Sequence, residues 1–394
     1  MRLAVWCSSY FKGFGGVEKV VNDLLNRFAE LGIDTYLIAN SFDQKQTNNI
    51  HYERLNPKVT IYQNTFSNPF DYLKQPLIFI LRLFRYFKAA VQLWGFLRRN
   101  QIQIIHLHFV SFDALLLAAY RFFMRYKFII TFAGSDIEAA RTELFARLKV
   151  KIALRCADGV TAVSQDLCDT LKTSYGFSKA LYIPNGINTK RIRQSTSVCL
   201  AGVREDNFVY CGRLVSVKRV PFLVEAFHRC IKQGCAKDLY LIGDGEEAGR
   251  IQALIAAYGM GTRIVSLGAL THAQALGVIH RSRCLLLSSS SEGCPLVALE
   301  ALALGRPIIA PNVGGLKEIV TDGENGYLYP FDRQDILCDL IMAIANNEDL
   351  PAKMGAKGPM TIAGKFEFDA VINRYLHIYD SMDRDMGREN ISSL

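Results

Sequence analysis

The fold is set by three consecutive segments near the start of the chain: RLAVWC at residues 2–7, EKVVNDLLNRFAEL at residues 18–31 and TYLIA at residues 35–39. The first and third are short apolar runs typical of buried strands, and the second repeats its apolar residues at helical spacing. A strand, a helix and a second strand in this order form the βαβ unit of a parallel sheet. The pattern predicts that the chain begins with a doubly wound α/β domain of Rossmann type.

The same alternation of strand-like and helical segments recurs along most of the 394 residues. Half of the residues are apolar, and a chain of this length exceeds what one compact core holds. The alternation is interrupted by the turn Pro184-Asn185-Gly186 and by a polar stretch at residues 194–207. We therefore predict two Rossmann-like, doubly wound α/β domains facing a cleft, at residues 1–195 and 200–367. Further strands are expected at residues 102–109, 128–132, 159–163, 180–183, 208–211, 239–242, 264–267, 284–287 and 307–310.

The net charge of the chain is +9, and it is unevenly distributed. Nine basic and two acidic residues lie between Asp71 and Lys127, so this stretch holds seven of the nine surplus charges. The stretch is rich in large aliphatic residues and has no recognisable reader motif, which argues against a nucleic-acid partner. The ten cysteines show no C-x-x-C spacing, so neither a metal knuckle nor a disulfide framework is expected.

The sequence also bears on location. No apolar run reaches the roughly 18 residues that cross a bilayer, and the first residues lack the pattern of a secretory signal, so we expect a cytoplasmic protein. A helix expected at residues 77–99 carries Arg82, Arg85 and Lys88 at every third position and large apolar side chains on its other faces. Such a helix suits an anionic membrane interface at the inner face of the cell membrane. The alternative is a core helix whose cations lie in water.

Glycine-rich loops follow several of the predicted strands, where ligands bind in open parallel sheets. Gly15 and Gly16 precede the first helix, and Gly314 and Gly315 precede another near residue 316. Glycine lets backbone N–H groups approach a diphosphate at a helix N-terminus. A tight turn between strand and helix uses glycine for purely structural reasons, and both interpretations remain open.

Two cations follow the strand expected at residues 208–211. Arg213 and Lys218 lie five positions apart in the loop that begins at Gly212. Together they suit a phosphate, the arginine through its planar fork and the lysine as a point charge. The alternative is a pair of solvated surface cations.

The segment SEGCPLVALE at residues 291–300 carries two glutamates separated by seven residues. Glu300 falls within an otherwise apolar helix, where a carboxylate needs a hydrogen-bond donor, and a ribose diol supplies one. Glu292 precedes that helix and is placed to accept a hydrogen bond from a sugar hydroxyl. In the alternative interpretation, each glutamate is partnered by the backbone or by another side chain.

These motifs occur in the order found in glycosyltransferase family four, which the chain resembles over nearly its whole length. The set comprises Gly15-Gly16, Ile183-Pro184-Asn185-Gly186, Gly212-Arg213 with Lys218, Gly243-Asp244-Gly245, Glu292 with Glu300, and Gly314-Gly315. The resemblance implies the GT-B fold and a retaining, metal-independent transfer of a sugar from a nucleotide diphosphate donor. It also implies that the last helix, residues 368–394, completes the N-terminal domain.

The resemblance further implies roles for individual residues. Arg213 and Lys218 would bind the donor diphosphate, Glu292 the sugar and Glu300 the ribose, and no cofactor or metal beyond the donor is expected. Arg213, Lys218 and Glu292 form the expected catalytic set. The residues implied in nucleotide-sugar binding are Gly15, Gly16, Asn185, Gly243, Gly245, Leu296, Val297, Glu300, Gly314 and Gly315.

One position departs from the family pattern. The family places a histidine in a T-x-H-G context, whereas TFAGSD at residues 131–136 has Ala133 there, so that role is not carried over. His106 and His108 are candidates for the acceptor side, with packed strand-end histidines as the alternative. Asp136 is a further candidate, with helix capping as its alternative.

The expected activity is a glycosyltransferase that acts on a lipid-linked or polysaccharide acceptor of the cell envelope, as in polysaccharide or lipopolysaccharide biosynthesis. Its partners would be a nucleotide sugar, the glycan or lipid-linked acceptor, and an anionic membrane surface. The single D-x-D sequence, at residues 383–385, lies in the C-terminal tail, which argues against a metal on the diphosphate. The alternatives are a nucleotide-sugar epimerase of GT-B fold and a donor-binding partner subunit without activity.

Overall fold

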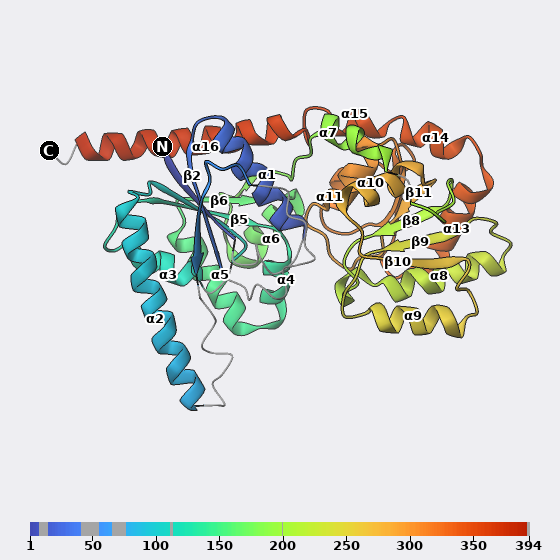
Figure 1. The fold of residues 1–394 in the computed structure, drawn as a ribbon, viewed down its shortest axis with the longest axis horizontal. Helices are drawn as coiled ribbons and strands as arrows, with labels where there is room; N and C mark the ends of the chain where they lie inside the picture. The colour runs from blue at the N-terminus through green and yellow to red at the C-terminus, as the bar shows by residue number, and fades with distance from the viewer. Residues whose placement is uncertain (8–14, 41–54, 65–75, 111–112, 199, 392–394) are drawn as a thin grey trace. The chain divides into compact units, whose positions relative to one another are not determined.

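The computed structural model describes residues 1–7, 15–40, 55–64, 76–110, 113–198 and 200–391. The chain divides into two compact units, each containing one sheet in which the strands are parallel (Figure 1). Unit 1 comprises Met1–Val163, Leu167–Ile183 and Ile372–Leu394, and unit 2 comprises Ser164–Asp166 and Pro184–Val371.

Unit 1 has a seven-stranded sheet in the order β3-β2-β1-β4-β5-β6-β7. Its central strands are buried almost throughout, as expected for a parallel sheet covered on both faces. The strands are β1 (Arg2–Trp6), β2 (Asp34–Asn40), β3 (Thr60–Asn64), β4 (Ile104–His108), β5 (Lys127–Phe132), β6 (Gly159–Ala162) and β7 (Leu181–Tyr182). The helices are α1 (Gly16–Glu30), α2 (Pro76–Arg99), α3 (Asp113–Tyr120), α4 (Ser135–Thr142), α5 (Leu144–Cys156), α6 (Gln165–Tyr175) and, from Ile372 onward, α16 (Phe368–Ile391).

Unit 2 has a six-stranded sheet in the order β10-β9-β8-β11-β12-β13. The strands are β8 (Phe208–Cys211), β9 (Leu239–Ile242), β10 (Ile264–Gly268), β11 (Cys284–Leu286), β12 (Ile308–Pro311) and β13 (Gly326–Tyr329). The helices are α7 (Thr189–Gln194), α8 (Val220–Lys232), α9 (Ala248–Ala257), α10 (His272–Arg281), α11 (Leu296–Ala303), α12 (Leu316–Ile319), α13 (Gln334–Asn346), α14 (Leu350–Gly355) and α15 (Gly358–Ile362), with 3₁₀ turns η3 (Ser195–Ser197) and η4 (Ser216–Lys218). Helices α8 and α13 pack together, and their apolar faces share one core with β8 and β9.

The structure adds two strands that the sequence pattern did not predict. Strands β3 and β13 form one edge of each sheet. Two of the four residues of β13 are only partly buried, and the residues of β3 whose burial is described are all partly buried or exposed. An edge strand has one neighbour, so its sequence lacks the continuous apolar run by which the central strands are recognised.

The border between the units also differs from the prediction. The main segment of unit 2 begins at Pro184, whereas the sequence placed the border between residues 195 and 200. Helix α7 contacts α11, and Ile192 is buried, so this segment belongs to unit 2. The last helix joins unit 1 from Ile372, slightly later than the residue 368 that the sequence suggested. The polar composition near residue 200 therefore marks a surface segment and not a domain border.

Candidate functional site

The candidate site in unit 2 lies at the switch point of the sheet. Strand β8 has β9 on one side and β11 on the other, so the chain leaves β8 in one direction and returns on its opposite side. Ligands of open parallel sheets bind at the carboxyl ends of the strands at such a point. The loop after β8 contains Arg213 and Lys218, and the loop after β11 contains Glu292. The topology therefore brings the two most informative segments of the sequence together.

Lys218 and Glu292 are in direct contact. The Lys218 Nζ donates a hydrogen bond to the Glu292 Oε1 at 2.6 Å, and the Ser289 hydroxyl donates to the same oxygen at 2.6 Å. Their side chains retain 20% and 8% exposure, so the ion pair is largely removed from water. The sequence predicted different ligand groups for these two residues, and the structure shows that each is also the partner of the other.

The backbone of the Lys218 segment is fastened to the loop after β11. The Ser288 hydroxyl donates to the Lys218 carbonyl at 2.8 Å, and the Ser290 amide donates to the Val217 carbonyl at 2.8 Å. Lys218 ends the 3₁₀ turn η4, and the next residue, Arg219, takes a left-handed backbone conformation at the start of α8. These contacts fix the direction from which Lys218 approaches Glu292.

Arg213 differs from Lys218 in its surroundings. Its side chain is exposed, and it makes no hydrogen bond or ion pair with any residue in the described ranges. Its backbone carbonyl accepts a hydrogen bond from the Tyr210 hydroxyl at 3.0 Å, which fixes the start of the loop. Arg213 is thus a solvated surface cation in this structure, whereas Lys218 is not.

Glu300 is buried in α11 and has a partner that the sequence did not reveal. The Nε2 of His272, the first residue of α10, donates a hydrogen bond to the Glu300 Oε1 at 2.7 Å. Burial raises the pKa of the Cys211 thiol to about 12, and the nearby charge of Glu300 adds to this shift. The carboxylate thus lies near the ends of β8 and β10. His272 lies soon after the end of β10, and this position was the one signal in the sequence that pointed to His272 as a site residue.

Packing explains why four of the predicted nucleotide-binding glycines are glycine. A Cβ atom on Gly243 would lie 1.9 Å from the Gly212 carbonyl oxygen, and one on Gly315 would lie 1.7 Å from that of Gly293. Gly245 and Gly314 approach the carbonyls of Leu214 and Glu292 in the same way. These glycines let neighbouring strand-end loops pack backbone against backbone. Binding of phosphate by their N–H groups stays a prediction.

Asn185 and the start of α11 lie together in unit 2. The Asn185 Nδ2 donates to the Cys294 carbonyl at 2.7 Å and so anchors the segment that leads into α11. Leu296 and Val297 open this helix, and the residue before them provides no side-chain cap. The first N–H groups of a helix without such a cap are suited to an anion.

In unit 1, Gly15 and Gly16 begin helix α1. Gly15 is the N-cap in an extended conformation, and a Cβ atom on Gly16 would meet no described atom within 4 Å. Packing among the described residues thus gives no reason for glycine at position 16, in contrast to Gly315. Residues 8–14, which precede Gly15, lie outside the described ranges.

His106 and His108 are both buried on β4. His106 lies between the Tyr379 hydroxyl and the Thr131 hydroxyl, each 2.6 Å from a ring nitrogen. Burial lowers the pKa of His106 well below its usual value and that of His108 to about 3, so both rings are neutral near pH 7. His106 therefore matches the packed-histidine alternative, whereas the Nε2 of His108 has no partner among the described residues.

Asp136 is a buried carboxyl on the second residue of α4. Its Oδ1 accepts hydrogen bonds from the amides of Gly134 and Ile137, so it acts in part as the predicted cap. Its Oδ2 has no partner among the described residues. Burial raises the pKa of Asp136 to about 6 despite these backbone donors. Ala133, where the family has histidine, lies between the end of β5 and the start of α4.

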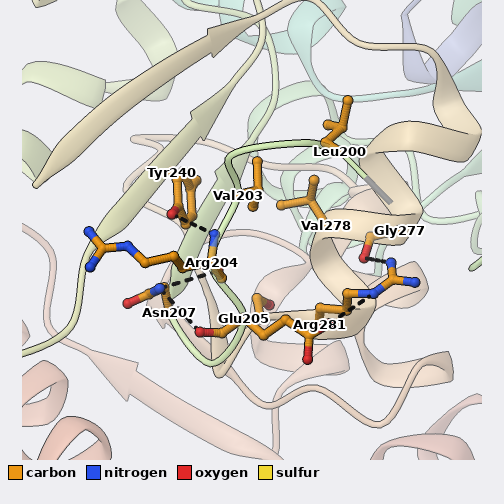
Figure 2. A pocket seen from close by; sticks show the side chains of 10 residues that line it. Leu200, Val203, Arg204, Glu205, Asn207, Tyr240, Gly277, Val278 and Arg281 are labelled. Atoms are coloured by element: carbon orange, nitrogen blue, oxygen red, sulfur yellow. Dashed lines mark hydrogen bonds and ion pairs between the residues drawn. The ribbon is translucent and has the colours of Figure 1, made fainter. Parts of the chain in front are cut away.

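A small pocket of unit 2 lies outside this set of residues (Figure 2). It has a volume of about 50 Å³ and is lined by Leu200, Val203, Arg204, Glu205, Asn207, Tyr240, Gly277, Val278, Arg281 and Ser282. Both arginines are engaged: Arg204 pairs with Asp238, and Arg281 pairs with Glu205. Ligand pockets usually measure about 300 Å³ or more, so this one is too small for a nucleotide.

Comparison with known proteins identifies the family. A model described as Glycosyltransferase Family 4 matches residues 14–191, and one described as Glycosyl transferases group 1 matches residues 201–360. N-acetyl-alpha-D-glucosaminyl L-malate synthase of Bacillus anthracis is 24% identical, covering 98% of each chain. Sucrose-phosphate synthase of Thermosynechococcus elongatus superposes with a TM-score of 0.80 at 20% identity, covering 98% of this chain and 100% of the other. HepE of Anabaena, solved with UDP, superposes with a TM-score of 0.75 at 18% identity, covering 97% of this chain and 100% of the other.

The two Rossmann-like units, matched by these solved structures, have the GT-B fold. The chain belongs to the group 1 glycosyltransferases of family 4, whose two models together span most of its length. The predicted fold class and enzyme class are confirmed. The roles of individual residues stay predictions.

Proposed function

We propose that this enzyme transfers a glycosyl group, with retention and without a metal, from a nucleoside diphosphate sugar to a glycan or lipid-linked acceptor of the cell envelope. The observation that carries the proposal is the contact between Lys218 and Glu292 at the switch point of unit 2, where Lys218 shares the loop after β8 with the exposed Arg213. The UDP held by HepE supports a nucleoside diphosphate as the leaving group.

The charges of this cluster suit departure of a diphosphate. Lys218 and Glu292 form an ion pair and largely neutralise each other. A bound donor adds negative charge, which Lys218 and Arg213 offset, and Glu292 accepts a hydrogen bond from a sugar hydroxyl. Preorganised cations of this kind stabilise charge that develops as the bond to the diphosphate breaks.

Retention follows from attack on the face that the diphosphate leaves. The acceptor oxygen forms a bond to the anomeric carbon while the bond between that carbon and the diphosphate oxygen breaks. The proton of the acceptor hydroxyl passes to the departing diphosphate, so no separate general base is needed. His106 and His108, both neutral near pH 7 and buried, are not required in this step.

The metal-free part of the proposal rests on the cations and on the place of the D-x-D sequence. Asp383, its first residue, lies on α16 and accepts a hydrogen bond from the Gln103 side chain at 3.0 Å. Initial rates should be unchanged by EDTA. A rate that returns only when magnesium or manganese is added back would overturn this part of the proposal.

The membrane part of the proposal rests on helix α2. Its C-terminal half is anchored by buried residues such as Leu93 and Leu97, whereas Leu77, Phe84 and Phe87 are about 70% exposed, at 72%, 70% and 67%. Figure 1 shows the N-terminal end of α2 extending away from the sheet of unit 1. Among the described residues, no helix has both the length and the apolar character to span a bilayer. Exposed aromatic side chains interspersed with cations suit the interface of an anionic membrane.

Vesicle cosedimentation tests the membrane part. The protein should pellet with vesicles containing anionic lipid at low salt and be released at high salt, and an Arg82, Arg85 and Lys88 triple glutamate variant should stay in the supernatant. The matched control replaces exposed cations of unit 2, namely Arg229, Lys232 and Lys357, with glutamate. Equal pelleting of both variants would favour a soluble acceptor.

The activity itself is tested with labelled nucleotide sugars and a membrane fraction as acceptor. Transfer of label to lipid or polysaccharide supports the proposal. Conversion of the donor to its epimer would identify an epimerase, and binding without turnover would identify an inactive partner subunit. The anomeric configuration of the product, measured by NMR against that of the donor, tests retention.

A further inference from the structure

His272 and Glu300 form a side-chain pair that lies outside the predicted set of catalytic residues. His272 begins α10, and its Nε2 donates to the Glu300 Oε1 at 2.7 Å across 28 residues of sequence. The His272 side chain retains 26% exposure and that of Glu300 retains 7%. A carboxylate at this depth requires hydrogen-bond donors to remain charged, and His272 is one of them.

The imidazole is held in place by the start of its own helix. Thr271 is the N-cap of α10 and forms a capping box with Gln274, in which each side chain binds the backbone amide of the other residue. This box fixes the backbone from which His272 projects. With Oε1 bound to a fixed donor, the Glu300 carboxylate cannot rotate freely, so its orientation is set before any ligand arrives.

A preset carboxylate suits a vicinal diol. A ribose offers two hydroxyl donors, and each carboxylate oxygen has two lone pairs, so Oε1 is able to accept from His272 and from a hydroxyl together. A 2′-deoxyribose offers one donor fewer. A site built to bind a hydroxyl rejects the analogue that lacks it because a buried acceptor then stays unmatched.

We propose that His272 is a positioning residue that orients Glu300 and thereby gives the donor site its preference for ribonucleoside over 2′-deoxyribonucleoside diphosphates. This inference rests on the proposed function, in which Glu300 binds the ribose. It deepens that function because it assigns the selectivity for ribose to the His272–Glu300 pair and not to Glu300 alone.

Calorimetric titration of UDP and 2′-deoxy-UDP tests the inference on the intact enzyme. The wild type should bind UDP about tenfold more tightly than 2′-deoxy-UDP, which is the effect expected of one hydrogen bond to a charged group. His272→Leu should reduce this ratio to about twofold, and His272→Gln, which keeps an N–H donor, should retain most of it. His280→Gln is the matched control on the same helix and should leave the ratio unchanged.

The outcomes separate this inference from the proposed function. If the wild type binds none of UDP, GDP and ADP, the proposed function fails. If it discriminates between a ribonucleotide and its deoxy form and His272→Leu does so equally well, the inference alone is overturned. A His272→Leu variant that loses affinity for both nucleotides equally also overturns it, because that pattern indicates a merely structural histidine. Should His272→Leu not fold, His272→Ala removes the donor without adding an apolar side chain and serves in its place.

Discussion

Replacing Lys218 with methionine should lower the stability of unit 2 much more than the same change at Arg213. The methionine keeps most of the apolar stem of Lys218 and removes the cation that contacts Glu292 at 2.6 Å. Glu292 then stays buried with the Ser289 hydroxyl as its remaining donor among the side-chain contacts described above. Arg213 is exposed and has no side-chain partner in the described ranges, so its replacement leaves no charge behind.

The size of the effect follows from burial. Breaking a fully buried ion pair costs about 3–5 kcal/mol, and exposed pairs contribute about 0.2–1 kcal/mol. With side-chain exposures of 20% and 8%, this pair lies between these limits, so about 2 kcal/mol is expected. For a unit of this size, that corresponds to a fall in Tm of about 4–8 °C. Arg213→Met should change the free energy of unfolding by no more than about 0.5 kcal/mol.

Scanning calorimetry of the two variants measures the difference, and a third variant isolates its cause. The double variant Lys218→Met with Glu292→Gln removes both charges, so it should melt at a higher temperature than Lys218→Met alone. Melting temperatures for Lys218→Met and Arg213→Met that agree within about 1 °C would refute the reasoning. A double variant that is less stable than Lys218→Met would show that the uncompensated charge of Glu292 is not the cause.

Three further predictions concern binding, packing and electrostatics. Glu300→Gln should lower the affinity for the free nucleotide, measured by calorimetry, whereas Glu292→Gln should leave that affinity nearly intact and lower the rate of transfer. Unchanged affinity in both variants would contradict this division of roles. Gly315→Ala should disrupt unit 2 because the new Cβ would lie 1.7 Å from the Gly293 carbonyl oxygen, whereas Gly16→Ala should have the melting temperature of the wild type. Equal melting temperatures for the two variants would show that the loops at Gly293 and Gly315 tolerate separation. Burial raises the pKa of Asp136 to about 6, so ionisation costs stability as the pH rises from about 4 to above 6. Asp136→Asn should therefore gain stability relative to the wild type across that interval, and a difference independent of pH would show that the carboxyl is not buried as described.

Much of the fold could be predicted from the sequence because its signals are local. A central strand of a parallel sheet is a short run of mostly apolar residues, as β8 and β9 are, and the helices between such strands repeat their apolar residues at helical spacing. Edge strands such as β3 carry a weaker signal and were missed. The loops that carry Arg213, Lys218 and Glu292 were recognised because strand ends in this fold class are where ligands bind.

The contacts within the site were beyond the reach of the sequence. Lys218 and Glu292 are 74 positions apart, and His272 and Glu300 are 28 apart, so neither pairing has a local signature. Which loops meet depends on the order of strands in the sheet, and the same succession of strands and helices is compatible with more than one order.

The sequence by itself determined the class of fold and the residue types available at the strand ends, because periodicity and composition act over a few residues. The tertiary structure decided which of these residues are partners. It showed that Lys218 is neutralised by Glu292 while Arg213 is exposed, and that Gly243 and Gly315 are required by loops in backbone contact. Burial and distance set the strength of a charge or a hydrogen bond, and both arise only when segments remote in sequence pack together.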